Sequence, residues 1–218
     1  VSSPMLGGDT GLAPDVQAIP AVVPGSVQQA LRHAGLLPDW NHELDARQCE
    51  WVENRHWVFA TTLPAEWGTL PGRKVLRCEG LDTLAGIRIN GKELGRTDNM
   101  FRTWEFKLNG IAKAGANRLE IRFDPVGPHM AKLEKARPLP TWNTPGASYV
   151  RKMPCNFGWD WGPTLVTSGI WRKISLIGFN TARWDNVQIL QNHGADGSVS
   201  LDITATAGPA SLTDPLPV

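Results

Sequence analysis

The chain has 218 residues, of which 41% are hydrophobic and 20% are charged, and its formal net charge is +1. This balance is that of an ordinary globular protein, and the near-neutral charge gives no electrostatic basis for binding nucleic acid or an anionic membrane. No apolar run is long enough to span a bilayer. No signal peptide is visible, but a mature secreted chain would look the same, so the compartment stays open.

The first predicted element is a short helix. Residues 1–20, which begin VSSPMLGGDTGLAPD, are expected to form a flexible lead-in. Ser26 is suited to cap the stretch VQQALRHA, in which apolar residues recur at helical spacing. Gly35 can adopt the left-handed conformation that ends a helix. We therefore expect one short helix near 26–34.

Most of the remaining segments alternate apolar and polar residues with a period of two, which indicates β-strands. The Asn90-Gly91 dipeptide favours a type I′ turn and predicts a hairpin. Many short strands with one helix indicate an all-β sandwich. The predicted strands, including the hairpin, lie in 56–62, 87–94, 101–108, 117–124, 171–179, 185–191 and 198–206.

The stretch 125–155 departs from this pattern. It contains six prolines and little alternation, apart from a short helical turn expected at 129–136. A loop of this length in a compact domain is commonly functional. It leads directly into FGWDWGPTLVTSGIW at 157–171, which holds three of the ten tryptophans.

The common catalytic and metal-binding motifs are absent from the sequence. It contains no GxSxG, no HExxH and no phosphate-binding glycine loop. Cys49, Cys78 and Cys155 form no CxxC pair and no zinc spacing, so we expect three reduced thiols, with one disulfide as the alternative. His56 is interpreted as a packed or surface histidine rather than a ligand. We predict no catalytic residue, no metal and no cofactor.

The motif GWDWG places Asp160 between two indoles on a backbone bracketed by glycines. Aromatic faces stack on the C–H faces of pyranose rings, and a carboxylate can accept two sugar hydroxyls at once. The structural alternative is that Asp160 pairs with Arg151 while both tryptophans fill the core. The residue chemistry alone leaves these two interpretations level.

Three separated blocks resemble the β-mannosidases of glycoside hydrolase family 2. They are PGSVQQALRHAGLLPD at 24–39, EGLDTLAGIRINGKELGRTDNMFRTWEFKL at 79–108 and VRKMPCNFGWDWGPTLVTSGIWRKISL at 150–176. The blocks occur in the family's order and cover most of residues 20–180. The RK…FGWDWGP…GIW block is typical of the mannosidases within the family.

The resemblance implies a domain organisation. The family begins with a jelly-roll (galactose-binding-like) β-sandwich, followed by an immunoglobulin-like domain and a (β/α)₈ barrel that carries two catalytic glutamates. A barrel alone needs about 250 residues, so we expect it to lie outside this chain, which by itself would be inactive. The expected division is a lead-in at 1–20, the jelly roll at 21–182 and the first strands of a truncated immunoglobulin-like domain at 183–218.

The resemblance also implies roles for residues of the motif. Asp160 is expected to bind hydroxyls of a terminal β-linked mannose and Trp159 to wall the pocket, where the loop reaches over the missing catalytic barrel. Arg151 and Lys152 are expected to anchor the loop, with charges that would also neutralise Asp160. Trp161 is assigned to packing.

Three functions therefore remain. The first is the sugar-binding domain of an exo-acting, retaining β-mannosidase. The second is a stand-alone carbohydrate-binding module. The third is the corresponding domain of a β-galactosidase- or β-glucuronidase-type enzyme. Strands at 185–206 that cannot complete a domain argue against the second, and the intact block at 150–176 argues against the third.

Overall fold

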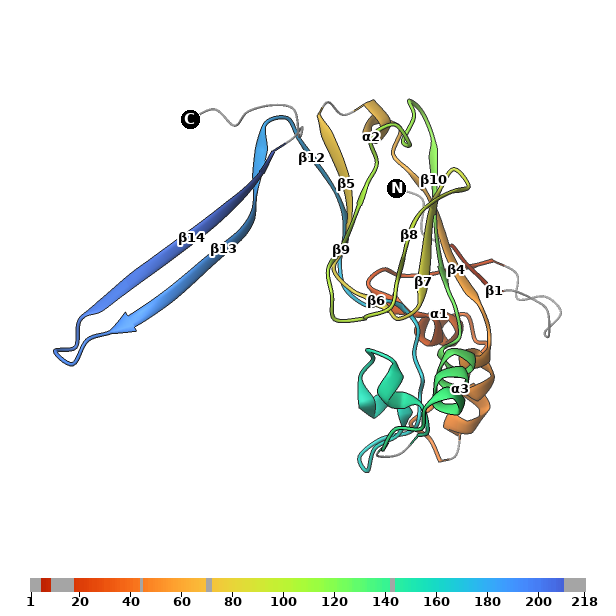
Figure 1. Cartoon of the computed structure of the whole chain (residues 1–218). Helices are drawn as coiled ribbons and strands as arrows, with labels where there is room; N and C mark the ends of the chain where they lie inside the picture. Colours follow the sequence, from red (N-terminus) through yellow and green to blue (C-terminus); the bar gives the residue numbers. More distant parts are fainter. Residues whose placement is uncertain (1–4, 9–17, 44, 70–71, 142–143, 210–218) are drawn as a thin grey trace.

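The chain folds as a β-sandwich, followed by a long hairpin that projects away from it (Figure 1). In this computed structural model, residues 5–8, 18–43, 45–69, 72–141 and 144–209 are described. Two facing layers of strands enclose the main core, which includes Phe59 and Ile87 from one layer and Leu76 from the other. Each fully buried side chain of this size stabilises the fold by about 1.5–3 kcal/mol relative to an exposed one. The all-β prediction is confirmed.

The larger layer is a six-stranded antiparallel sheet, and the facing layer is a three-stranded sheet. The larger sheet has the order β2 (Ile19–Pro20), β1 (Met5–Gly8), β4 (Trp57–Leu63), β10 (Asn117–Phe123), β7 (Ala85–Ile89) and β8 (Lys92–Thr97). The facing sheet has the order β12 (Ile174–Phe179), β5 (Arg73–Cys78) and β9 (Trp104–Lys107). A small sheet joins β3 (Gly25–Ser26), β11 (Gly169–Ile170) and β6 (Leu81–Asp82).

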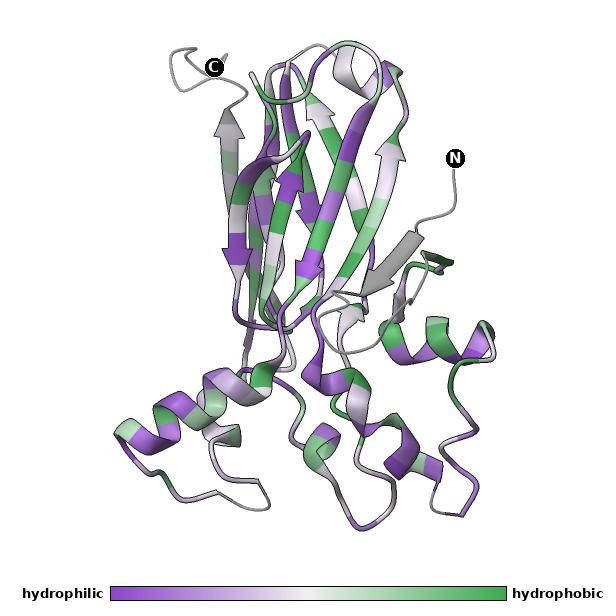
Figure 2. Cartoon of the chain, turned by 90° about the vertical axis from the view of Figure 1, so that its right-hand side faces the viewer, coloured by the Kyte–Doolittle hydropathy of each residue, from purple (hydrophilic) through white to green (hydrophobic). Residues whose placement is uncertain are grey.

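The period-two pattern correctly identifies the faces of the central strands. In β10, Leu119, Ile121 and Phe123 are buried, whereas Arg118 and Arg122 are exposed. Figure 2 shows the same alternation of hydrophobic and hydrophilic residues along the strands. One face of the six-stranded sheet therefore packs on the core, and the other carries charged side chains to solvent.

The predicted hairpin is β7–β8, and its turn lies at Asn90 and Gly91. Both residues have positive φ, 52° and 79°, which is the backbone of a type I′ turn. Asn90 also holds the next strand of the sheet, because its Oδ1 accepts a hydrogen bond of 3.0 Å from the Arg118 N–H. The dipeptide therefore sets both the turn and the register of its neighbour.

The predicted helix is α1 (Val27–His33). The Ser26 hydroxyl accepts a hydrogen bond from the Gln29 N–H at 3.2 Å, and the Gln29 side chain accepts one from the Ser26 N–H at 2.9 Å. This reciprocal capping satisfies two backbone donors at the start of the helix. Its buried face packs on the end of the sandwich.

The structure contains more helix than the sequence indicated. The stretch expected to be mainly loop begins with α3 (Val126–Ala136), where Val126 and Met130 are one turn apart and both buried. The remaining helical segments are α2 (Glu66–Thr69) and three 3₁₀ helices, η1 (Asp45–Asn54), η2 (Ala147–Tyr149) and η3 (Pro154–Phe157). Apart from α2, the helical segments gather at one end of the sandwich, with the loops that connect them (Figure 2).

The projecting hairpin consists of β13 (Ala182–His193) and β14 (Val199–Pro209). Its base is tied to the sandwich by an ion pair from Arg183 to Glu105 in β9. Trp184 is 68% exposed, because no second layer covers the hairpin in the part of the chain that the structure describes. The other large apolar side chains exposed on it are Val187, Ile189, Leu190, Val199, Leu201 and Ile203.

The three cysteines are free thiols, as expected, and they differ in accessibility. Burial raises the pKa of Cys78 to about 12, and burial together with Asp45 raises that of Cys49. Cys155 is only partly buried. Since the thiolate is the reacting form, the raised pKa values make Cys78 and Cys49 slow to react at pH 8.

We therefore predict that one thiol per folded chain reacts rapidly with a disulfide reagent at pH 8. The reaction is followed by absorbance, and Cys155→Ser is expected to remove the fast phase. Unfolding in guanidinium should expose the other two thiols. Three fast thiols in the folded wild-type chain would contradict the burial of Cys49 and Cys78.

Candidate functional site

The motif that the sequence singled out lies in an irregular segment between α3 and β11. We define residues 150–168 as the WDWG loop. It lies at the end of the sandwich that carries α3 and η3. Its architecture has three parts, which are a base fixed to the sheets, a buried middle and an exposed tip.

The first strand-like residues of the loop are joined to the connection between β8 and β9. Arg151 forms a parallel bridge with Asn99, and its carbonyl accepts a hydrogen bond of 3.0 Å from the Met100 N–H. The other end of the loop runs into β11, where Gly169 pairs with Asp82 of β6. Both ends are therefore fixed by backbone pairing.

A buried ion pair closes the base between these ends. The Lys152 ammonium group donates to both carboxylate oxygens of Asp82, at 2.6 and 2.5 Å, and to the Thr167 carbonyl at 2.7 Å. The Thr167 hydroxyl donates to Asp82 at 2.8 Å. The Lys152 side chain is 0% exposed and that of Asp82 4%. One ammonium group thus links the beginning of the loop, its end and β6.

Burying the Lys152–Asp82 ion pair costs desolvation free energy, and removing one partner destabilises the fold. Burial lowers the pKa of Lys152, because the charged form loses its hydration, and the Asp82 carboxylate opposes that effect. The donors around Asp82 include the Thr83 hydroxyl at 2.5 Å. A buried charge pair with its hydrogen bonds satisfied holds a geometry firmly, since removing either partner leaves an uncompensated charge.

The middle of the loop packs on α3. Phe157 and Val166 are buried in a small cluster with Val126 and Met130 of the helix. The Asn156 side chain donates to the Leu165 carbonyl at 3.3 Å, which joins the two sides of the loop. Gln28 of α1 donates to the Val166 carbonyl at 3.0 Å. The tip is therefore carried by a packed stem.

The tip is a tight turn over residues 159–162. Trp159 and Gly162 form an antiparallel bridge, which leaves Asp160 and Trp161 at the two central positions. Gly158 precedes the turn with φ of +103°, and a Cβ atom there would lie 2.7 Å from the Thr164 hydroxyl oxygen. Glycine is therefore required at 158, because another residue would be both strained and obstructed.

The turn presents its side chains to solvent. Trp159 is 38% exposed and Trp161 is 75% exposed, and their rings meet with centroids 5.2 Å apart. Asp160 is exposed and has no hydrogen bond or ion pair with any residue in the described part of the chain. Its acceptor sites are therefore available to a ligand.

The sequence-predicted residues divide into two groups. Trp159, Asp160 and Trp161 meet at the tip, whereas Lys152 lies at the base. Trp161, which was assigned to packing, is 75% exposed at its turn position, and its ring contacts that of Trp159.

The structural alternative of an Asp160–Arg151 pair is not present among the described residues, and neither indole of the motif fills the core. Lys152 neutralises Asp82 rather than Asp160. Arg151 is exposed and contributes its backbone to the base of the loop.

Sequence reasoning missed Asp82 and Thr167. Asp82 belongs to the GLDT stretch and Thr167 to the VTSG stretch, so both fall within blocks that carry the family resemblance. Asp82 and Lys152 are 70 residues apart, and no local pattern relates them. In the described ranges, no group of three or more His, Cys, Asp or Glu side chains is placed to hold a metal ion. No helix within those ranges is long and apolar enough to cross a membrane.

Comparisons with known proteins agree on one family. The family described as "Glycosyl hydrolase 2 galactose-binding domain-like" matches residues 9–172. The β-mannosidase of Rattus norvegicus is 30% identical over 183 residues, which is 79% of this chain and 21% of that protein. β-Mannosidase B of Thermothelomyces thermophilus is 33% identical over 168 residues, which is 75% of this chain and 20% of that protein. The chain thus spans about a fifth of the length of these relatives.

Solved structures extend the comparison. The β-D-mannosidase of Dictyoglomus thermophilum superposes with a TM-score of 0.84 at 30% identity, over 94% of this chain and 25% of that one. The exo-chitosanase of Amycolatopsis orientalis superposes with a TM-score of 0.72 at 14% identity, over 97% of this chain and 24% of that one. The second similarity concerns the fold alone.

Proposed function

Because this chain belongs to the galactose-binding-like domain family of glycosyl hydrolase 2, we propose that it is the N-terminal sugar-binding domain of an exo-acting, retaining β-mannosidase. In this proposal the WDWG loop contributes one wall of a pocket for a terminal β-linked mannose. The reaction itself uses two glutamates of a catalytic barrel outside these 218 residues. One glutamate protonates the leaving oxygen and the other forms the glycosyl-enzyme, with the two carboxyl groups about 5–5.5 Å apart.

The observation that carries the proposal is the tip of the loop. Asp160 is exposed, is unpaired among the described residues and stands between two exposed indoles on a rigid stem. A carboxylate with unused acceptor sites can receive two neighbouring sugar hydroxyls, and an indole face can pack on a pyranose ring. Because the Asp160 carboxylate has no partner among the described residues, it does not stabilise the isolated domain. This favours a role in binding a ligand.

The hairpin supports the proposed domain division. We propose that residues 183–218 begin a second, immunoglobulin-like sandwich and that 21–182 form the jelly roll. Strand β13 exposes four large apolar side chains and β14 exposes three. A single two-stranded hairpin is only marginally stable in water. Such a hairpin needs further strands or another layer to cover it, and the continuing chain of a larger enzyme would supply them.

The most direct test is made on the complete gene. Sequencing beyond codon 218 is expected to show an open frame that encodes a barrel. The complete protein is expected to cleave an aryl β-D-mannoside faster than the matching β-D-galactoside or β-D-glucuronide. A faster reaction with either of the latter would support the domain of a different family 2 enzyme instead.

The chain by itself is expected to bind mannose only weakly and to hydrolyse nothing. One indole and one carboxylate provide a few kcal/mol of attraction, from which the entropy of capture is subtracted, and about 4 kcal/mol corresponds to a Kd of roughly 1 mM. We expect calorimetry on the 218-residue chain to give a millimolar Kd or weaker. Micromolar binding of mannose would favour a stand-alone carbohydrate-binding module, and turnover of an aryl β-mannoside by the pure chain would contradict the proposed division of labour.

A further inference from the structure

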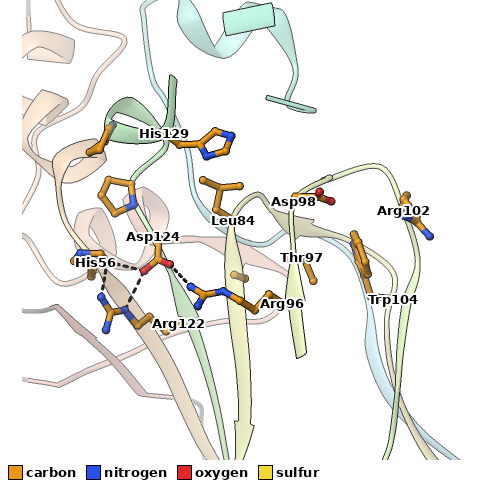
Figure 3. Close-up of a pocket in the computed structure, with 13 residues that line it drawn as sticks. His56, Leu84, Arg96, Thr97, Asp98, Arg102, Trp104, Arg122, Asp124 and His129 are labelled. Atoms are coloured by element: carbon orange, nitrogen blue, oxygen red, sulfur yellow. Dashed lines mark hydrogen bonds and ion pairs between the residues drawn. The ribbon is translucent and has the colours of Figure 1, made fainter. Parts of the chain in front are cut away.

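A second site lies at the end of the six-stranded sheet and shares no lining residue with the WDWG loop. There the end of the sheet, the start of α3 and the connection from β8 to β9 enclose a pocket of about 770 Å³ (Figure 3). This volume is within the range of small-molecule sites, roughly 300–1,000 Å³. The pocket is lined by His56, Leu84, Ala85, Arg96, Thr97, Asp98, Arg102, Trp104, Arg122, Asp124, Pro125, Pro128 and His129.

One wall of the pocket consists of two arginines and a histidine around a single carboxylate. Arg96 of β8 donates to one oxygen of Asp124 at 2.9 Å, and Arg122 of β10 donates to the other at 3.0 Å. His56 lies 2.7 Å from that second oxygen, and its Nδ1 is also 2.9 Å from the Arg122 guanidinium. Figure 3 shows all three groups converging on Asp124.

The two arginines keep N–H donors that do not contact Asp124. Each arginine contacts Asp124 through one nitrogen of a guanidinium that has five N–H donors. One amino group of Arg122 also lies 2.9 Å from His56 Nδ1. The side chains of Arg96 and Arg122 are 65% and 51% exposed, so the other donors of both guanidinium groups can reach solvent. Asp124 is 24% exposed and fixes the two forks in place.

The opposite wall offers an aromatic surface. The Arg102 guanidinium lies 4.5 Å from the centroid of the Trp104 ring, and no carboxylate pairs with Arg102 in the part of the chain that the structure describes. Leu84, Pro125 and Pro128 add apolar surface. Three arginines line the pocket against two aspartates, so one positive charge is in excess even with both histidines neutral.

We propose that this pocket binds an oxyanion carried by a sugar, either a phosphate or a carboxylate group. The guanidinium forks of Arg96 and Arg122, held by Asp124, receive the oxyanion, because a planar fork matches two oxygens of such a group. The Trp104 wall receives the ring. This site is separate from the WDWG loop, and it does not depend on the proposed mannosidase function.

The same strand provides a matched control. Arg118 lies four residues before Arg122 in β10, on the same exposed face, and pairs with Glu120 at 2.8 Å. Its side chain is 63% exposed, similar to those of the two pocket arginines, but it does not line the pocket. A substitution of Arg118 therefore measures how much ligand binding changes when an exposed arginine of this sheet is lost outside the pocket.

The test uses the 218-residue chain and three probes, which are glucose 6-phosphate, glucuronate and neutral glucose, titrated at constant ionic strength. Binding is followed by the amide resonances and by the indole resonance of Trp104. We expect saturable shifts at His56, Thr97 and Trp104 with at least one charged sugar and none with glucose. The tighter of the two charged sugars identifies the group, phosphate or carboxylate.

Substitutions of the arginines test which side chains bind the oxyanion. Arg122→Gln and Arg96→Gln are each expected to weaken binding of that sugar at least tenfold, whereas Arg118→Gln leaves it within about twofold. Arg96→Gln guards against a folding defect, because it leaves Asp124 in contact with Arg122 and His56. Absence of saturable shifts with both charged sugars, equal binding of glucose, or an equal loss in Arg118→Gln would overturn the proposal.

Discussion

Lys152→Met is expected to destabilise the fold by about 3–5 kcal/mol, because it leaves the Asp82 carboxylate buried without its countercharge. For a domain of this size, that loss corresponds to a fall in Tm of roughly 10 °C. The substitution affects the Asp82 carboxylate. Asp82 would keep the hydroxyl donors of Thr83 and Thr167 but lose an ammonium group that contacts both of its oxygens.

The measurement is thermal or urea unfolding of the 218-residue chain, with two companions. Adding Asp82→Asn to Lys152→Met removes the orphaned charge, and we expect the double variant to regain part of the lost stability. Arg118→Gln, which removes an exposed ion pair, is expected to cost less than about 1 kcal/mol. If Lys152→Met melted within about 2 °C of the wild type, the ion pair would not hold the base of the loop.

The framework of the sandwich was predictable because its causes are local. In β10, alternation alone distinguishes Ile121, which is buried, from Arg122, which is exposed. At the β7–β8 turn, Asn90 and Gly91 adopt the positive φ that their residue types permit. Ser26 and Gln29 cap α1 through contacts three residues apart. Each of these signals lies within a few residues of the structure that it determines.

The exposed tryptophans show where residue type misleads. Trp57 is buried as its strand position predicts, but Trp161 and Trp184 are 75% and 68% exposed. Trp161 occupies a turn position, and Trp184 belongs to a hairpin that no second layer covers among the described residues. A large apolar side chain packs only where another layer exists to receive it, and that depends on topology rather than on the residue.

The two charged clusters could not be predicted because their members come from distant segments. His56, Arg96 and Asp124 belong to three different parts of the chain, and only the pairing order of β4, β10, β7 and β8 brings them to one end of the sheet. Arg122 lies on the polar face of its strand, as the alternation within 117–124 indicates. Which neighbours that face would acquire depends on the sheet order, which the alternation does not reveal.

The candidate sugar site was predictable in composition but not in geometry. Asp160 stands out in the sequence because it lies between Trp159 and Trp161. The turn that exposes it depends on the bridge between Trp159 and Gly162, and on a stem in which Phe157 packs on α3. The structure therefore adds that the carboxylate is presented at a tip on a rigid support, as the proposed binding role requires.

Asp160→Ala is expected to lower kcat/KM for an aryl β-mannoside by roughly 100-fold or more in the complete enzyme that we propose. The substituted carboxylate would no longer accept hydrogen bonds from the mannose hydroxyls, each worth about 1.5–3 kcal/mol, and 1.36 kcal/mol is a factor of ten. If these bonds strengthen as the ring distorts toward the transition state, part of the loss falls on kcat. Trp159→Ala is expected to cost less, because a wall contributes packing and no charge.

Stability measured on the same variants separates binding from structure. Asp160 is exposed and has no partner in the described part of the chain, so Asp160→Ala is expected to leave Tm nearly unchanged while activity falls. Asp160→Asn keeps the shape and removes the charge, so its kcat/KM is expected to lie between those of the wild type and the alanine variant. Asp39→Ala, which removes another surface aspartate, is the control and should leave kcat/KM unchanged. A lowered Tm with intact kcat/KM in Asp160→Ala would show instead that Asp160 stabilises the loop, and the proposed contact with mannose would be wrong.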